Sequence, residues 1–192
     1  MFEVRIHGRG GQGVVTAAEL LSVAAFAEGR HAQAFPSFGS ERMGAPVVAF
    51  CRIDDHPIRS REPVLHPDVL IVQDPTLLHQ VDVFQGLDPD GWVLINSKRS
   101  FDELGVGDIA QRLRRERVIT VPATEIALRH LGRPLPNAVL LGGFAALTGL
   151  LTLESVQHAI RDTFAGAVAQ KNAAAAAEAY AYVKEGQHAQ AN

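Results

Sequence analysis

The stretch VRIHGRGGQGVVTAAELL, residues 4–21, decides which fold we expect for this chain. Apolar and polar residues alternate over 2–7, which is typical of a strand, and apolar residues recur at helical spacing over 14–28. Between the two lie the glycines of a G-x-G-x-x-G pattern: Gly8, Gly10 and Gly13. A strand that enters a helix through such a turn predicts the first crossover of a parallel α/β sheet.

The rest of the chain continues this alternation of strands and helices. Apolar runs predict strands over 47–53, 68–74, 91–97 and 117–123, and a further strand beginning near residue 31. Helices are expected over 76–84, 108–115, 124–131, 138–151, 153–164 and 168–184. This pattern predicts an α/β fold: a single three-layer, doubly wound, mostly parallel sheet with helices on both faces. We expect one domain over 1–186 and a frayed tail over 187–192.

The composition excludes several classes of protein. With 192 residues, 47% of them hydrophobic, the chain can bury one sizeable core, and its net charge of -3 gives no bulk attraction to nucleic acid. The single Cys51 cannot form an internal disulfide or ligate an iron–sulfur cluster within this chain. The N-terminus lacks the pattern of a signal peptide, and the apolar tract 138–151 is too short to span a membrane, so we expect a cytoplasmic protein.

The glycine-rich turn predicts a phosphorylated ligand. Glycines let the backbone turn tightly and approach a ligand, and the amide groups at the start of the following helix favour phosphate. A nicotinamide or flavin dinucleotide would need an acidic side chain about 20 residues further on to bind its ribose. Gln33 stands there, and neither Asp nor Glu occurs between Gly29 and Ser40. The sequence therefore favours a phosphorylated ligand other than a dinucleotide. The alternative is a turn that only packs helix against strand.

A second loop, FPSFGSERMGAPV over 35–47, is expected to share this cleft. It follows the second strand, and in a doubly wound sheet it leaves from the same edge as the glycine turn. Arg42 could donate paired hydrogen bonds to a phosphate or carboxylate, with Ser40 as a further donor. The alternative is that Glu41 and Arg42 are merely solvated neighbours.

Five segments, in this order, resemble the gamma subunit of pyruvate and related 2-oxoacid:acceptor (ferredoxin) oxidoreductases. They are HGRGGQGVVTAAELL (7–21), FPSFGSERMGAPVVAFCRI (35–53), LHPDVLIVQD (65–74), DGWVLINS (90–97) and LGRPLPNAVLLGGFAALTG (131–149). The resemblance covers nearly the whole chain. Five motifs in one order are far more specific than the glycine pattern alone.

The resemblance implies a subunit of a larger enzyme that decarboxylates a 2-oxoacid on thiamine diphosphate and transfers the acyl group to coenzyme A. Thiamine diphosphate, Mg²⁺ and the [4Fe-4S] clusters are then expected on alpha, beta and delta-type partner subunits, with ferredoxin or an NAD-linked acceptor taking the electrons. This chain would supply the coenzyme A site. The family's binding positions fall here on Gly8, Arg9, Gly10, Gly11, Gln12, Gly13, Ser37, Ser40, Arg42 and Asn137.

Several residues have a second interpretation. Asp74 is as well explained as a helix cap, and Asn137 as the N-cap of the apolar helix that follows it. His7 is expected to be a strand-end residue and not a metal ligand, and Cys51 a small core residue. Two other functions stay open: a free-standing dinucleotide-binding oxidoreductase and a module that senses an acyl-CoA. Pyruvate, 2-oxoglutarate, branched-chain and aryl 2-oxoacids all stay open as the substrate.

We predict that Arg42→Ala weakens coenzyme A binding and leaves oxoacid-dependent dye reduction in a single turnover intact. The reason is that a guanidinium at this position would neutralise a phosphate of the carrier, whereas the oxoacid pocket would belong to other subunits. Calorimetric titration with coenzyme A tests this. An unchanged affinity would remove Arg42 from the site.

Overall fold

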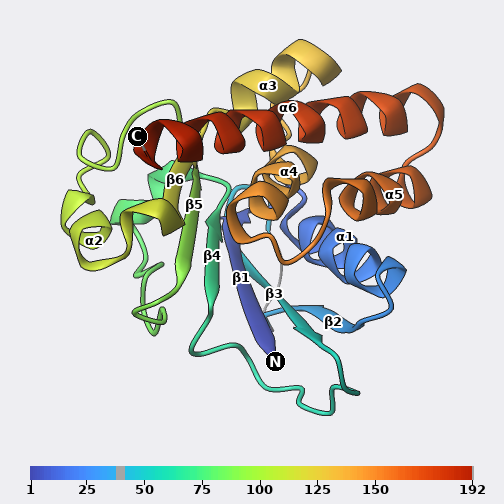
Figure 1. The fold of residues 1–192 in the computed structure, drawn as a ribbon, viewed down its shortest axis with the longest axis horizontal. Coiled ribbons are helices and arrows are strands. Elements are labelled where there is room, and N and C mark those ends of the chain that lie inside the picture. Colours follow the sequence, from blue (N-terminus) through green and yellow to red (C-terminus); the bar gives the residue numbers. More distant parts are fainter. Residues whose placement is uncertain (38–41, 192) are drawn as a thin grey trace.

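The computed structural model describes residues 1–37 and 42–191, and it forms a sheet flanked by helices (Figure 1). The strands are β1 (Phe2–Arg9), β2 (His31–Pro36), β3 (Pro46–Asp54), β4 (Val69–Val72), β5 (Trp92–Asn96) and β6 (Val118–Val121). The α-helices are α1 (Val14–Ala27), α2 (Gly107–Arg112), α3 (Ala123–Leu131), α4 (Asn137–Thr148), α5 (Leu153–Thr163) and α6 (Gly166–Ala191). Two short 3-10 helices are η1 (Pro75–His79) and η2 (Arg115–Arg117).

The six strands form one mixed sheet in the order β2-β3-β1-β4-β5-β6. Strands β1, β4, β5 and β6 are parallel, which confirms the expected α/β fold and mostly parallel sheet. One feature differs from a simple doubly wound sheet, because β3 lies between β2 and β1 and is antiparallel to both. No helix lies between Pro36 and Pro46 in the described part of this connection to return the chain across the sheet, so β3 runs in the opposite direction.

The two faces of the sheet are covered unequally. The larger core includes the inward side chains of α1 and α4, packed with Val4 and Ile6 of β1. A smaller core on the opposite face includes Leu77 of η1 with Leu70 and Val72 of β4. A longer helix was expected over 76–84, but the structure has only the short η1 there. The residues after η1 include valines and an aspartate, which are weak helix formers.

On the face of the sheet opposite α1, β1 and β3 are covered by loops and not by helices. Two buried arginines hold these loops by hydrogen bonds. Arg5 donates to the carbonyl oxygen of Val83 at 2.9 Å, and Arg52 donates to the carbonyl oxygen of Glu62 at 2.6 Å. Arg52 is also paired with Glu3 at 2.7 Å. Guanidinium groups suit this role because loop carbonyls taken out of water need donors.

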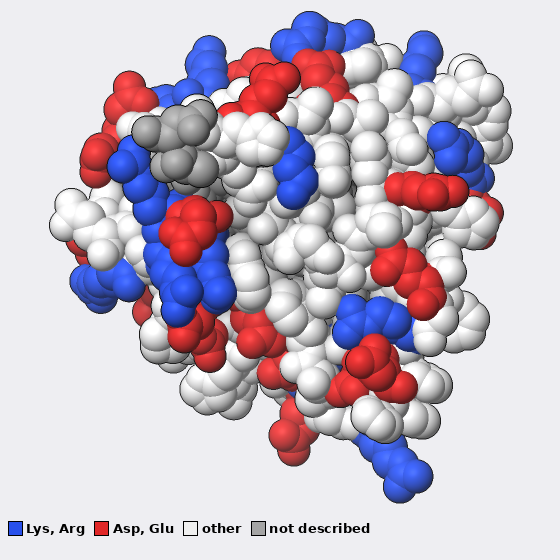
Figure 2. Space-filling model, viewed as in Figure 1, with Lys and Arg blue, Asp and Glu red and all other residues white. Residues whose placement is uncertain are grey.

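On the face viewed in Figure 2, basic and acidic side chains lie interspersed.

The apolar helix α4 lies between the sheet and α6. Every residue from Asn137 to Leu147 is buried, which confirms the expected core helix. The alanine run of α6 packs against it, with Ala173, Ala175, Ala176 and Ala179 all buried. The tail that we expected to fray is helical as far as Ala191, because no helix-stopping residue follows Gly186. In the parts of the chain that the structure describes, no helix is both long and apolar enough to cross a bilayer.

We predict opposite effects for two adjacent glycines of α4. A Cβ at Gly142 would overlap the carbonyl oxygen of Ala176 in α6, whereas a Cβ at Gly143 would make an ordinary contact with Leu94 at 3.5 Å. Gly142→Ala should therefore lower the free energy of unfolding by about 1–3 kcal/mol through overpacking. Gly143→Ala should leave it unchanged or raise it by up to about 1 kcal/mol, the helix-propensity gain. Urea unfolding measures both; equal effects would contradict the close packing of α4 on α6.

Candidate functional site

The glycine-rich turn joins β1 to α1 at the carboxyl edge of the sheet. Gly13 precedes α1 in the left-handed conformation, with φ 68°, which strongly favours glycine. Gly10 has no room for a side chain, because a Cβ there would overlap the carbonyl oxygen of Arg42. The turn therefore needs glycine at Gly13 for its backbone angle and at Gly10 for the close approach of a second segment.

That second segment is the loop between β2 and β3, which the sequence predicted to lie at the same edge of the sheet. Ser37 and Arg42 of this loop do not line the cleft described below. The Gly10 amide donates to Ala45 at 2.9 Å, and the Gly44 amide donates to Gly10 at 3.1 Å. Strand β2 runs in the same direction as β1, so its end reaches the same edge of the sheet. Ser37 lies at that end with its amide bonded to Val48 at 2.8 Å. The Arg42 side chain is exposed beside the turn, and Ser40, another expected ligand residue, lies outside the described residues.

Two helices begin beside the turn without side-chain caps. No side chain within the described ranges caps α1 or α4. Asn137, in the first turn of α4, donates to the carbonyl oxygen of Gly13 at 3.3 Å and so joins the two helix starts. Asn137 is therefore not an N-cap: Pro136 holds that position. The first-turn amides of both helices carry partial positive charge, which favours an anion.

A cleft of about 490 Å³ opens between these helix starts, α3 and α6. Its wall includes Gly11, Gly13 and Thr16 of the turn and α1, together with Asn137. The remaining lining is of three kinds: apolar (Leu131, Leu135, Phe164, Val168), amide (Asn172) and cationic (Arg133, Lys171). Such a cleft suits a ligand that carries both phosphate groups and an apolar part.

Arg133, Lys171 and Asn172 were not among the residues that the sequence predicted. Arg133 lies within the quoted segment 131–149, so the sequence offered a signal for it. Lys171 and Asn172 lie further along the chain, in α6, and no motif marks them. The packing of α6 over α4 brings them to the cleft. Asn172 is 5% exposed and donates to Val168 at 2.9 Å.

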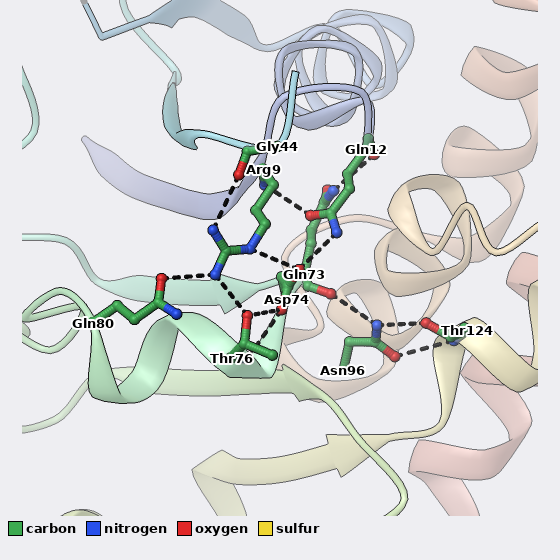
Figure 3. Close-up of polar contacts among 9 residues, drawn as sticks. All are labelled: Arg9, Gln12, Gly44, Gln73, Asp74, Thr76, Gln80, Asn96 and Thr124. Atoms are coloured by element: carbon green, nitrogen blue, oxygen red, sulfur yellow. Dashed lines mark hydrogen bonds and ion pairs between the residues drawn. The ribbon is translucent and has the colours of Figure 1, made fainter. Parts of the chain in front are cut away.

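On the other side of the turn, the side chains of Arg9 and Gln12 bind Asp74 (Figure 3). Gln12 Nε2 donates to Asp74 at 2.8 Å, and Arg9 Nε lies 3.2 Å from the same carboxylate. Asp74 also accepts from the amide of Thr76 at 3.0 Å, which confirms that it caps η1. Burial of this carboxyl group opposes its ionisation, but the hydrogen bonds from Thr76 and Gln12 outweigh burial and lower its pKa.

This network extends to the ends of two neighbouring strands. Gln73, just after β4, donates to the carbonyl oxygen of Gln12 at 2.9 Å, and Asn96, at the end of β5, donates to Gln73 at 2.8 Å. Asn96 in turn accepts from the amide of Thr124 at 3.0 Å (Figure 3). Sequence reasoning gave no role to Gln73 or Asn96. The network holds the turn to the sheet edge.

Other candidate residues have structural roles. Cys51 is buried, and burial raises the pKa of its thiol to about 12, which confirms a core residue. His7 lies on β1 with 7% of its surface exposed, and its Nε2 has no hydrogen-bond partner among the described residues. Within the same parts of the chain, no group of three or more His, Cys, Asp or Glu side chains could hold a metal ion.

Comparison with known proteins identifies relatives over nearly the full length. Residues 3–182 match the family model "Pyruvate ferredoxin/flavodoxin oxidoreductase". The chain is 51% identical over 182 residues to the "Pyruvate/ketoisovalerate oxidoreductases common subunit gamma" of Pyrococcus abyssi, covering 94% of this chain and 96% of that protein.

Solved structures agree with this result. Pyruvate oxidoreductase subunit PORC from Thermotoga maritima superposes with a TM-score of 0.78 at 36% identity, covering 94% of this chain and 95% of that chain. A 2-oxoglutarate:ferredoxin oxidoreductase from Magnetococcus marinus, solved with 2-oxoglutarate, coenzyme A and succinyl-CoA bound, gives a TM-score of 0.74. At 16% identity, over 96% of this chain and 31% of that chain, the second match shows the fold alone.

We predict that His7 makes stability depend on pH. Burial, assisted by the charge of Arg5, lowers the pKa of His7 from 6.5 to about 4. Between these two pH values the imidazole is protonated in the unfolded chain and neutral in the folded chain. This contribution to stability is complete above pH 6.5 and is lost as the pH falls towards about 4, by about 3 kcal/mol at most.

Urea unfolding of the purified chain at pH 7 and pH 5 measures this loss. His7→Gln should remove most of the difference between the two pH values, whereas the exposed His31→Gln should retain it. A difference that is the same in the wild type and the His7 variant would contradict the prediction.

Proposed function

Because this chain belongs to the pyruvate ferredoxin/flavodoxin oxidoreductase family, we propose that it is the gamma subunit of a multi-subunit enzyme that oxidises a 2-oxoacid. Its task in that enzyme is to hold coenzyme A, whose thiol accepts the acyl group after the 2-oxoacid has lost CO2 and two electrons. Its partners are the alpha, beta and delta-type subunits, and the electrons pass to ferredoxin or to an NAD-linked acceptor.

The cleft beside the uncapped start of α1 is the single observation that carries the coenzyme A proposal. Coenzyme A has a diphosphate and a 3′-phosphate, which match helix amides together with the cations of Arg133 and Lys171. Its adenine ring and pantetheine arm can contact the apolar wall that includes Leu135 and Phe164. The amide side chains of Asn137 and Asn172, both more than nine-tenths buried, can bond polar groups of the arm.

A dinucleotide has less support. Strand β2 ends at Phe35 and Pro36, and Gln33 lies within the strand, so this strand supplies no acidic side chain for a ribose. Coenzyme A needs no such residue. It also carries the reacting thiol itself, so this chain needs no nucleophile of its own.

The contribution of this subunit is then one of position. Holding the phosphate end of the carrier restricts where its thiol can lie, which converts a bimolecular encounter into a reaction between bound groups. Cys51 is the single cysteine of the chain and is buried, so the chain cannot ligate a [4Fe-4S] cluster, and no group of three or more His, Cys, Asp or Glu side chains among the described residues could hold a metal ion. We therefore assign thiamine diphosphate, Mg²⁺ and the [4Fe-4S] clusters to the partner subunits.

We predict that the cleft cations contribute to the affinity for coenzyme A. Arg133→Gln and Lys171→Gln should each raise the Kd of coenzyme A for the assembled complex about fivefold, because each removes about 1 kcal/mol of attraction to phosphate. The double variant should raise this Kd more than tenfold. Isothermal titration calorimetry with coenzyme A measures this. Arg161→Gln, which changes an exposed arginine on α5, is the matched control.

Two results would count against the proposed function. A wild-type complex that does not bind coenzyme A, or that binds NADH instead, would exclude a coenzyme A subunit. A double variant with the affinity of the wild type would exclude this cleft as the place where the phosphates bind.

A further inference from the structure

We propose that Asp74 is a positioning residue for the ligand cleft: it holds the glycine turn from outside the cleft, through Gln12, so that the first amides of α1 stay directed at the ligand. This proposal rests on the proposed function. Asp74 does not line the cleft, so its effect on the ligand passes through the turn.

Both oxygens of the Asp74 carboxylate accept hydrogen bonds (Figure 3). One oxygen accepts from Gln12 Nε2 at 2.8 Å and faces Arg9 Nε at 3.2 Å. The other accepts from Thr76, at 3.0 Å from its amide and 2.6 Å from its hydroxyl group. A carboxylate suits this position because every neighbour is a donor.

Gln12 carries the effect of Asp74 across the turn. The side-chain Oε1 of Gln12 accepts from the backbone amide of Arg9 at 2.7 Å, and the backbone amide of Gln12 donates to the carbonyl oxygen of Arg9 at 3.0 Å. The backbone carbonyl oxygen of Gln12 accepts from the side chain of Gln73 at 2.9 Å. Arg9, Gln12 and Gln73, which make these bonds, do not line the cleft. Gly11 and Gly13, on either side of Gln12, line the cleft. The glycine turn is therefore bound to Asp74 through Gln12, and it faces the ligand cleft through Gly11 and Gly13.

Hydrogen-bond polarity makes the link testable. An asparagine in place of Asp74 would turn an NH2 group towards Gln12 Nε2 or towards Thr76, and either way one donor would face another. Rotating the amide of Gln12 does not relieve this, because its Oε1 is needed by the Arg9 amide. A glutamate in place of Gln12 restores the match, because its two oxygens can accept from the Arg9 amide and from the NH2 group of that asparagine.

The experiment compares D74N, Q12E and the double variant D74N/Q12E in the assembled complex, with coenzyme A as the titrant. D74N and Q12E should each raise the Kd and the KM for coenzyme A at least tenfold and leave the KM for the 2-oxoacid unchanged. The double variant should return to within about threefold of the wild type. D108N, which removes an exposed carboxylate paired with Arg112, is the control.

Stability is measured alongside binding, because a helix cap that did nothing else would change only the melting temperature. If D74N does not assemble, Q12M replaces it in the test. Q12M removes the hydrogen bond between Gln12 and Asp74 and leaves Asp74 in place as the cap of η1. It too should raise the Kd for coenzyme A at least tenfold.

The results separate the two proposals. If the variants bind coenzyme A as the wild type does, or if the double variant binds no better than D74N, the positioning role of Asp74 is wrong while the coenzyme A site stands. If the wild-type complex itself does not bind coenzyme A, the proposed function fails.

Discussion

The hydrogen bonds of Gln12 are the constraint on which the rest of this structure depends. They join the β1–α1 turn to the end of β4, because the same side chain bonds the Arg9 amide and the Asp74 carboxylate. A glycine-rich turn has few side chains of its own to limit its conformation, so its shape must come from neighbours. Here the neighbours are polar side chains at the edge of the sheet. They leave the opposite side of the turn, with the uncapped α1, open to a cleft.

The two faces of the sheet are covered by different kinds of structure. Helices, among them α1, α4 and α6, cover one face, and the alanines of α6 allow that helix to lie close to α4. The other face is covered behind β1 and β3 by loops, held by hydrogen bonds from Arg5 and Arg52. The cleft opens on the helical side, where α6 adds Lys171 to groups supplied by segments much earlier in the chain.

Local patterns predicted most of the fold. The strand–turn–helix order at 4–21, the apolar strands and the buried helix after Asn137 follow from periodicity and from glycine and proline positions. One expectation was wrong for a local reason, because η1 replaces a longer helix. Helix α6 extends to Ala191, further than the helix expected over 168–184. The closeness of the glycine turn to the second loop was also predictable, since both follow strands that run in the same direction.

The sequence by itself determined most of the elements and the glycine turn, because each depends on neighbours within a few residues, and the order of the strands placed the second loop beside that turn. Only the tertiary structure decided that β3 lies between β2 and β1, that Gln12 and Arg9 bind Asp74, and that Arg133 and Lys171 meet at one cleft. Such features join residues far apart in the chain, as Gln12 and Asp74 are at a separation of 62 positions. No local preference encodes such a separation; the packing of the whole core selects it.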